Sequence, residues 1–348
     1  MVSERKRPTE FGGTLGACVL VLGLPLALEY RCNSLYALAV SLVIFLLYWI
    51  SGGSFKWIHE HFNQLAFAAF VLSALLSIFL FVKSFQVNEK YLAEHGNTNS
   101  EIFNFWMGRE LNPRIFEIDL KFVCELRPGL IGWLILNLSF LFLSFERGTF
   151  TWSLAFVILG HSIYVIDALV NEPAILSTMD ITDEGFGYML SFGDLCWVPF
   201  LYTLQARYLL EHPQHWNIFA MILFLAAFLV GFAIFRGSNN QKNKFRTNPN
   251  DPSIAHLKTM TTKSGKKLLV SGFWGISRHP NYMGDLLMSL SWSLPSGTCL
   301  IAYFYPIYFL GLLISRFERD EKNCRKKYGS DWDKYCEIVP YKIFPYIY

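Results

Sequence analysis

The middle of the chain carries residue types that bind phosphate. Residues 236–282 contain nine lysines and arginines against a single acid, Asp251. Lys242 and Arg246 are four residues apart, so a helix would place both side chains on one face. Two cations held in this way could bind the phosphates of a ligand. The alternative is that the stretch only fixes membrane topology, because basic loops at a membrane surface contact anionic lipid.

The next stretch, 268–285, combines glycines, a His-Pro turn, aromatic residues and charge. Its centre is the sequence RHPNY at 278–282, with Trp274 before it and Asp285 after it. Pro280 and Gly284 could simply begin a helix, but a helix start needs neither the arginine nor the Asn-Tyr pair. Polar groups at a membrane boundary need a partner. We therefore interpret this stretch as part of a binding site.

A third set of charged residues follows the last apolar run. On a helix, Arg316 and Asp320 face the same way, and their proximity to the apolar run predicts that they lie near the membrane surface. The pair could hold a polar ligand there, although a solvated helix end would have a similar composition.

Polar groups also lie within or beside the apolar runs, where ionisable side chains usually line a cavity or a proton path. They are His161, Tyr164, Asp167, Glu172, Asp180, Asp183, Glu184 and Asp194. Two Arg-Glu combinations precede these runs, in 108–114 and 124–129. Taken alone, we interpret both as ion pairs that fix loops.

The elements that must position these residues are membrane helices. Of the 348 residues, 53% are hydrophobic, 17% aromatic and 16% charged, a balance that excludes disorder and disfavours a pair of soluble domains. The apolar runs are 13–28, 34–50, 64–85, 128–144, 150–170, 186–204, 217–235 and 283–315. Most approach the ~20 residues that cross a bilayer, and Pro295 divides the last run into two short helices. We predict an all-α, polytopic transmembrane bundle with about nine spans.

Charge and cysteine spacing refine this picture. The short N-terminus, 1–12, is expected in the cytosol before a retained signal-anchor, and the positive-inside rule places 236–282 on the same side. The seven cysteines form no C-x-x-C pair and no metal-like spacing, which predicts a reduced protein without a metal site. The chain has no Walker loop and no G-x-G-x-x-G after a strand. The basic loop also lacks a nucleic-acid-binding fold, so nucleic acid is not an expected partner.

Several motifs, in order, carry a family resemblance. They are GRELNPR at 108–114, CELRPG at 124–129, LVSG at 269–272, RHPNY at 278–282 and VPYKIFPYIY at 339–348. With them the chain resembles the sterol reductases of the endoplasmic reticulum, and most closely the delta(14)-sterol reductase branch, which includes the membrane domain of the lamin B receptor. The likeness runs from about residue 30 to the end, with a short match at 10–13.

The resemblance implies a bundle of about ten transmembrane helices, with a sterol entering from the bilayer and NADPH from the cytosol. It implies a sterol-binding region at 13–235 and an NADPH-binding region at 236–348. Lys242 and Arg246 are then expected at the cofactor's phosphates, and Leu269, Trp274, Asn281 and Tyr282 in its pocket. The remaining cofactor positions would be Arg316, Asp320, Cys324, Arg325, Lys326, Lys327, Tyr328 and Tyr335. Tyr164 would donate a proton, with Asp320 beside the nicotinamide.

The chemistry implied by the resemblance is reduction of the 14,15 double bond of a sterol. The implied location is the endoplasmic reticulum, as a multi-pass membrane protein, with the inner nuclear membrane as a second location. An isolated alkene is not electrophilic, so a proton must be delivered to carbon 15 before hydride can add at carbon 14. General acid catalysis of this kind contributes ~10² to 10⁴-fold. Membrane lipids are the other expected partners.

This sequence departs from the family pattern in two places. Where members usually have His-Asp-Gly-Phe-Gly, residues 183–187 are Asp-Glu-Gly-Phe-Gly, which we expect to alter a polar network on the sterol side. The likeness also passes from Leu28 directly to Tyr30, without the family's second span. Either the first apolar run does not span, or the sequence is a shortened isoform or an incomplete gene product.

Two other functions remain open from the sequence. One is a noncatalytic nuclear-envelope protein similar to the lamin B receptor, although only about twelve residues precede the first apolar run. The other is a membrane methyltransferase that uses S-adenosylmethionine, because the spacing from Arg278 to Gly284 also resembles the ending of the isoprenylcysteine methyltransferases. The motifs at 108–114 and 124–129 disfavour the methyltransferase.

Overall fold

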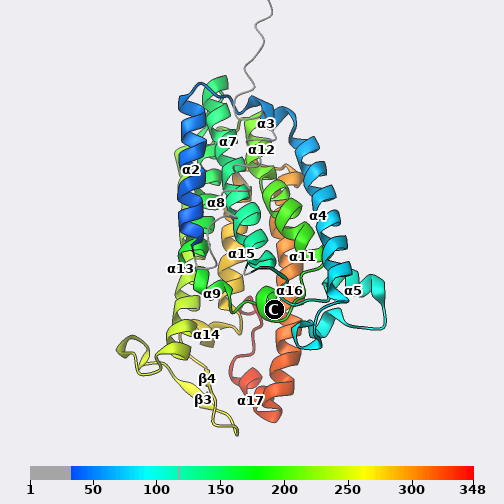
Figure 1. The fold of residues 1–348 in the computed structure, drawn as a ribbon. Coiled ribbons are helices and arrows are strands. Elements are labelled where there is room, and N and C mark those ends of the chain that lie inside the picture. Colours follow the sequence, from blue (N-terminus) through cyan, green and yellow to red (C-terminus); the bar gives the residue numbers. More distant parts are fainter. Residues whose placement is uncertain (1–32, 117) are drawn as a thin grey trace, which may run out of the picture. The chain divides into compact units, whose positions relative to one another are not determined.

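The computed structural model describes residues 33–116 and 118–348, and these are mainly helical (Figure 1). The strands within the described residues form two short antiparallel hairpins, β1 (Arg114–Ile115) with β2 (Ile118–Asp119) and β3 (Thr259–Thr261) with β4 (Lys267–Leu269). The predicted all-α membrane class is therefore confirmed. The first apolar run, 13–28, and the junction after Leu28 where the family's second span is missing lie outside the described residues.

Five helical segments among the described residues are long and apolar enough to cross a membrane. They are Phe62–Ser84, Leu120–Arg147, Trp152–Val170, Ile218–Thr247 and Leu300–Tyr328. Each contains or overlaps a predicted span. The run at 34–50 forms a shorter apolar helix of 17 residues, and the run at 186–204 is divided among several short helical segments.

The chain divides into two compact units, of which the first contains the described residues up to Phe150 together with His161–Glu211. Its α-helices are α2 (Ser34–Ile50), α3 (Lys56–Glu60), α4 (Phe62–Ser84), α5 (Glu101–Met107), α6 (Leu120–Cys124), α7 (Gly132–Arg147), α9 (Glu172–Ile175), α10 (Met179–Thr182), α11 (Tyr188–Phe192) and α12 (Leu204–Glu211). The short 3₁₀ turns η2 (Glu89–Tyr91) and η3 (Glu94–Gly96) precede α5. Helix α8 (Trp152–Val170) joins this unit from His161 onward.

Two π-helical segments lie within the first unit, η4 (Glu125–Ile131) and η5 (Gly193–Leu201). Each contains a proline, Pro128 or Pro199, which cannot donate a backbone hydrogen bond inside a helix and so favours a local change of pitch. The two segments pack together, and a Cβ added to Gly129 would lie 3.4 Å from the Asp194 carbonyl oxygen. The CELRPG motif therefore provides a close helix contact.

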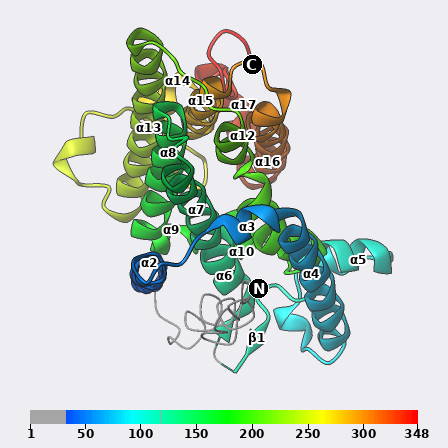
Figure 2. The ribbon, with the colours of Figure 1, turned by 90° about the horizontal axis from the view of Figure 1, so that it is seen from above.

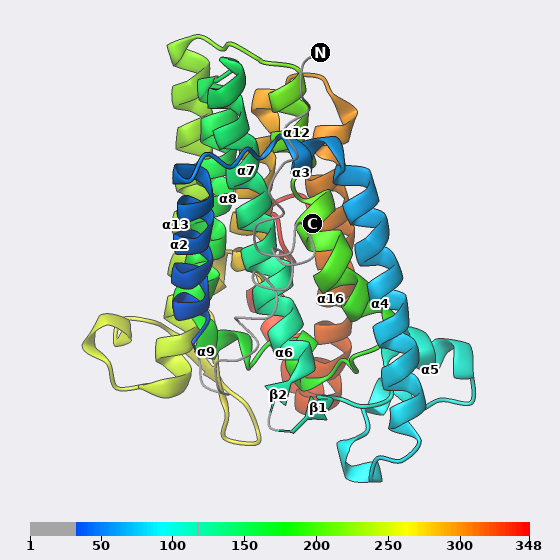
Figure 3. The same cartoon turned by 45° about the horizontal axis from the view of Figure 1, so that its top comes forward.

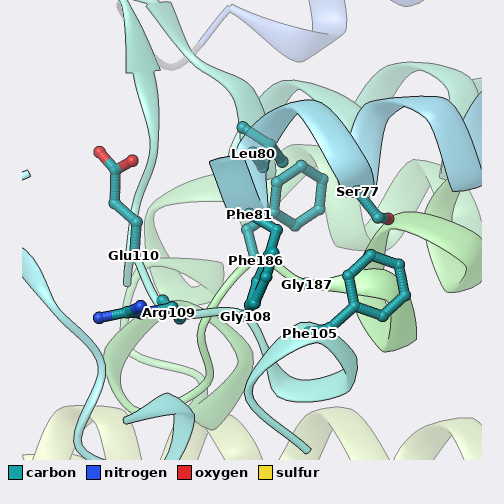
Figure 4. A pocket seen from close by; sticks show the side chains of 9 residues that line it. All are labelled: Ser77, Leu80, Phe81, Phe105, Gly108, Arg109, Glu110, Phe186 and Gly187. Carbon is teal, nitrogen blue, oxygen red and sulfur yellow. The ribbon is translucent and has the colours of Figure 1, made fainter. Parts of the chain in front are cut away.

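The Gly-Phe-Gly sequence at 185–187 also serves backbone packing. Gly108 has φ +88°, and a Cβ there would lie 2.2 Å from the Gly187 nitrogen, so neither position can hold a side chain. The Phe186 amide donates to the Glu110 carbonyl at 3.0 Å. Figure 4 shows these residues around a small pocket between α4, α5 and the loop at 185–187.

The second unit contains Thr151–Gly160 and His212–Tyr348. Its α-helices, apart from the start of α8, are α13 (Ile218–Thr247), α14 (Phe273–Ile276), α15 (Pro280–Ser293), α16 (Phe304–Tyr328) and α17 (Ser330–Ile338). The 3₁₀ turns η6 (Pro252–Ile254), η7 (Leu294–Ser296) and η8 (Leu300–Tyr303) connect them. The break at 294–297, predicted from Pro295, separates α15 from α16.

Helices α13 and α15 pack closely, and both can be followed in Figure 2. A Cβ on Gly284 would lie 2.5 Å from the Phe235 nitrogen, and one on Gly231 would lie 2.8 Å from the Gly284 carbonyl oxygen. The glycines thus allow the two backbones to approach. This contact places the start of α15, with the RHPNY motif, beside the polar end of α13.

Candidate functional site

Helix α13 carries the first pair of predicted phosphate ligands. The apolar run ends at residue 235, where we expected a loop to begin, but the helix continues to Thr247. Five of the twelve residues of this extension, the arginines, lysines and glutamine, are good helix formers. The helix ends two residues before Pro249, which disfavours a helical residue in front of it. Lys242 and Arg246 therefore lie on one helical face. Their charges interact with each other and with that of Asp320.

Trp274 lies directly against Lys242. The Lys242 Nζ is 4.2 Å from the centre of the indole ring, a cation–π contact. Two hydrogen bonds hold α14 on α13: Trp274 Nε1 donates to the Ser238 carbonyl at 2.9 Å, and the Phe273 amide donates to Gln241 Oε1 at 3.1 Å. Gly272 has φ +65° and contacts Gln241 so closely that a Cβ would lie 2.5 Å from it. Ser271 and Gly272, the last two residues of the LVSG motif, thus turn the chain towards Trp274.

His279 and Asp320 join α15 to α16. The His279 Nε2 lies 3.2 Å from Asp320 Oδ2, and the imidazole is buried. Its ring stacks on Tyr282, with centroids 4.6 Å apart, and meets the Phe317 ring edge to face at 5.2 Å. Burial lowers the pKa of His279 below its ordinary value, although its hydrogen bond with Asp320 opposes this shift.

Asn281 and Tyr282 form the first turn of α15. Asn281 is partly buried, and its Oδ1 has no hydrogen-bond partner among the described residues. The other ring nitrogen of His279, Nδ1, is also buried and has no hydrogen-bond partner among the described residues. Buried polar atoms normally have partners. These two atoms are therefore available to a bound polar group.

Glu321 connects Arg278 to the last helices. Its carboxylate accepts from the Arg278 guanidinium at 3.1 Å and from Trp332 Nε1 at 2.9 Å. It also lies 3.7 Å from a terminal nitrogen of Arg325. The Arg278 backbone amide donates to the Tyr341 carbonyl and that of His279 to the Lys342 carbonyl. The RHPNY motif and the C-terminal motif VPYKIFPYIY are thus hydrogen-bonded partners.

A mainly aromatic cluster joins α17 to the β3–β4 hairpin. Trp332, Tyr335 and Val339 are buried, and Tyr328 stacks on Trp332 with centroids 6.0 Å apart. Met260, Leu268 and Val270 of the β3–β4 hairpin, together with Cys324 and Cys336, pack against this cluster. The Asp331 carboxylate accepts from the Lys263 amide at 2.6 Å and ties the hairpin to α17. That hydrogen bond lowers the pKa of Asp331, whereas burial raises the pKa of the Tyr335 phenol.

The predicted cofactor residues of this unit differ in exposure. Leu269, Trp274 and Tyr335 are buried, and Arg316, Asp320, Cys324 and Tyr328 are partly buried. Arg246, Arg325, Lys326 and Lys327 are exposed. Arg325 is bound to Asp333 at 2.8 Å, and Lys327 Nζ lies 5.3 Å from the Tyr328 ring centre. The second unit therefore has cations on α13 and α16, together with the buried ring of Trp274 and the buried amide oxygen of Asn281.

Tyr164 belongs to the first unit. It lies on α8 with its ring centroid 6.0 Å from that of Trp133, a fully buried residue of α7. The Trp133 ring centroid also lies 4.8 Å from that of His161. Asn137 Nδ2 lies 3.0 Å from His161 Nδ1. Two of the intramembrane groups predicted from the sequence, His161 and Tyr164, are thus both in contact with Trp133.

The first upstream motif contains an ion pair that fixes its loop, but the partner differs from the one expected. Glu110 does not pair with its neighbour Arg109 but with Lys83 of α4, at 2.7 Å. The Arg109 guanidinium packs over the Phe85 ring at 4.2 Å and donates to Asn97 Oδ1. Adjacent residues of an extended loop point in opposite directions, so the neighbouring side chain is a poor partner.

His279 and Glu321 are the residues that sequence reasoning missed as members of this site. Both stood within motifs that we singled out, but each acts through a partner on another helix. A histidine immediately before a helix-starting proline was the available signal for His279. Glu321 was indistinguishable from the other charges of its run.

Comparisons with known proteins agree with these motifs. A model of the ergosterol biosynthesis ERG4/ERG24 family matches residues 10–348. Delta(14)-sterol reductase erg24 of Schizosaccharomyces pombe is 48% identical over 326 residues, which cover 92% of this chain and 77% of that protein. Delta(14)-sterol reductase TM7SF2 of Mus musculus is 50% identical over 286 residues, or 82% of this chain and 68% of the relative.

The similarity extends to a longer vertebrate protein. Delta(14)-sterol reductase LBR of Gallus gallus is 48% identical over 334 residues, covering 92% of this chain and 52% of the relative. This chain therefore matches about half the length of the chicken protein. The resemblance predicted from the motifs is confirmed.

Proposed function

The chain belongs to the ERG4/ERG24 family of ergosterol biosynthesis, and we propose that it catalyses the NADPH-dependent reduction of the 14,15 double bond of a sterol. Relatives that are 46–50% identical are named delta(14)-sterol reductase, which supports the class of reaction. The family match favours this reductase over the methyltransferase that RHPNY alone left open. We propose the endoplasmic reticulum membrane as its location, with the inner nuclear membrane as a second one.

The observation that carries the proposal is the joint position of cations and buried acceptors in the second unit. Lys242 and Arg246 interact electrostatically at the end of α13, and Lys242 lies on Trp274. Phosphates suit such paired cations, since charge-assisted hydrogen bonds are the stronger ones. The free buried acceptor on Asn281 can receive an N–H of a bound amide. These features fit a reduced nicotinamide dinucleotide, and we assign residues 236–348 to binding it.

Within that region each predicted residue has a role that its position permits. Lys242, Arg246 and Arg316 would neutralise phosphate charge. Trp274 and Tyr282 would present flat apolar surfaces, and Leu269 and Tyr335 would close the pocket from the side of the hairpin and α17. Cys324, Arg325, Lys326, Lys327 and Tyr328 would line the cytosolic edge along the end of α16.

The proposed reaction requires a proton donor and a hydride donor. Protonation of carbon 15 leaves a tertiary cation at carbon 14, and bound NADPH supplies the hydride that adds there. We propose Tyr164, in the sterol-binding region 13–235, as the residue that donates the proton. The buried ring of Trp133 restricts where the phenol can lie. Asp320 would lie beside the nicotinamide, with its carboxylate oriented by His279.

Sterol-dependent oxidation of NADPH tests this proposal. We expect the purified protein in detergent to oxidise NADPH only when a 14,15-unsaturated sterol is added, with the saturated product identified by mass spectrometry. Arg316→Gln should abolish the reaction. Lys322→Gln, an exposed charge on the same helix, should leave it unchanged. Methyl transfer from S-adenosylmethionine, or sterol turnover unaffected by Arg316→Gln, would refute the assignment.

A further inference from the structure

Helix α5 of the first unit has an arrangement opposite to that of a helix on a water-soluble surface. Its polar residue Asn104 is 2% exposed, whereas the apolar residues Ile102, Phe103 and Trp106 are 84%, 45% and 46% exposed. The other polar residue, Glu101, begins the helix and is exposed. Water-facing helices normally show charged and polar residues outward and apolar residues inward. Trp106 contacts Tyr188 of α11, with ring centroids 5.8 Å apart, yet it stays nearly half exposed. The exposed surfaces of these three large apolar side chains therefore need an apolar partner outside the described residues.

The side chains on the inward side of α5 form hydrogen bonds and ring contacts within the protein. Asn104 Oδ1 accepts from the Thr98 amide at 2.7 Å, and its Nδ2 donates to the Thr98 carbonyl at 2.8 Å. The Phe105 ring meets Phe81 of α4 edge to face, with centroids 5.7 Å apart, and stacks on Tyr188 of α11 at 5.9 Å. The helix is thus fixed in its orientation, and the outward apolar face is a consequence of this packing.

The position of α5 identifies the partner. Helix α4 is one of the five membrane-spanning candidates, and its final turns expose Ile78, Phe79 and Val82, each about half or more exposed. Phe81, which holds α5, belongs to these same turns. Figures 1 and 3 both place α5 beside the last part of α4. The polar end of α4 comes directly after these exposed apolar residues, and there Lys83 forms an ion pair with Glu110. The outward face of α5 thus continues the lipid-facing surface of α4 at the level where the span ends.

We propose that α5 is an interfacial membrane anchor, with Ile102, Phe103 and Trp106 inserted between phospholipids at the boundary of headgroups and acyl chains. Tryptophan is enriched at this depth because its ring is apolar and its N–H is polar. Interfacial helices bind by burying such an apolar face at this boundary. The anchor holds the connection between α4 and α6 against the bilayer, and with it the Gly108 contact to residues 185–187.

Site-specific photocrosslinking tests the anchor. Phe103 is replaced by p-benzoylphenylalanine, an aromatic residue that inserts into nearby C–H bonds when illuminated, and the full chain is reconstituted in phosphatidylcholine nanodiscs. Phe105 is the matched control, because it lies on the same helix but packs against α4 and α11. We expect phosphatidylcholine adducts at position 103, and adducts within the chain at position 105.

Intact-protein mass spectrometry distinguishes the outcomes. A lipid-sized mass increase at position 103 that is at least fivefold more abundant than at position 105 would support the anchor. Crosslinking of position 103 to protein, either within the chain or to a second copy, would overturn it. Equal lipid labelling of the two positions, or no lipid labelling at position 103, would also overturn it.

Discussion

The imidazole Nε2 of His279 lies 3.2 Å from Oδ2 of Asp320, although the two residues are 41 positions apart in the chain. This pair joins the RHPNY motif at the start of α15 to the charged face of α16. In the proposed function Asp320 acts beside the nicotinamide, so His279 is a positioning residue for it. The buried ring also packs on Tyr282 and Phe317.

His279→Ala should weaken NADPH binding about 10- to 100-fold. A hydrogen bond to a charged group contributes about 1.5–3 kcal/mol, and the replacement also removes the surface on which Tyr282 stacks. Equilibrium binding of NADPH to the purified protein measures the change. His256→Ala, at an exposed position of the same unit, serves as the control. An affinity equal to that of the control would show that His279 does not organise the site.

Acid should destabilise the second unit through the same histidine. Burial lowers the pKa of His279, so the unfolded chain takes up a proton as the pH falls below about 6.5 while the folded protein does not. The contribution of His279 to stability should therefore be constant above this pH and decrease below it. Apparent melting temperatures in detergent between pH 5 and 8 measure the slope. His279→Gln should reduce the loss at low pH, whereas parallel curves for the two proteins would contradict this origin.

Glu321→Gln should destabilise the protein by about 2–4 kcal/mol, because it leaves the buried Arg278 without its charged partner. The variant also weakens the acceptor for Trp332. A lower apparent melting temperature is the expected result. Glu318→Gln removes an exposed charge from the same helix and should have little effect. If the two variants had the same apparent melting temperature, Glu321 would not be the connection between α16 and the last helix.

Gly108→Ala should prevent correct folding of the first unit. The residue has φ +88°, and the new Cβ would lie 2.2 Å from the Gly187 nitrogen, a distance that only a backbone shift can relieve. Gly148→Ala is the control, since Gly148 also has a positive φ, +66°, but no atom within 4 Å of its Cβ position. That variant should lose only about 1 kcal/mol. Expression and gel-filtration profiles in detergent compare them, and a well-folded Gly108→Ala protein would refute the proposed close contact.

The sequence predicted the features that depend on local spacing. The positions of Lys242 and Arg246 follow from their separation of four residues, and the break between α15 and α16 follows from Pro295. Five predicted spans coincide with long apolar helices because a run of apolar residues is itself the signal for a membrane helix. The continuation of α13 to Thr247 was missed because hydropathy marks where the lipid ends, not where the helix ends.

Features that depend on packing between distant segments were not predictable in this way. The partner of Asp320 could be identified only after α15 and α16 were placed together, and the partner of Glu110 only after α4 was placed beside the loop. The inverted face of α5 is a similar case. Its sequence contains no long apolar run, and only the burial of Asn104 shows which residues point outward.

Direct binding of NADPH tests the central claim that paired cations on α13 hold the cofactor. The measurement compares the protein with the double variant Lys242→Gln/Arg246→Gln, and with Lys244→Gln/Lys266→Gln as a control that removes the same charge from exposed positions. We expect the first double variant to lose about a hundredfold in affinity, since two charged hydrogen-bond donors are removed, and the control to change less than about twofold, because its charges lie outside the proposed contacts. No NADPH binding by the unaltered protein, or equal affinities in all three proteins, would contradict the claim.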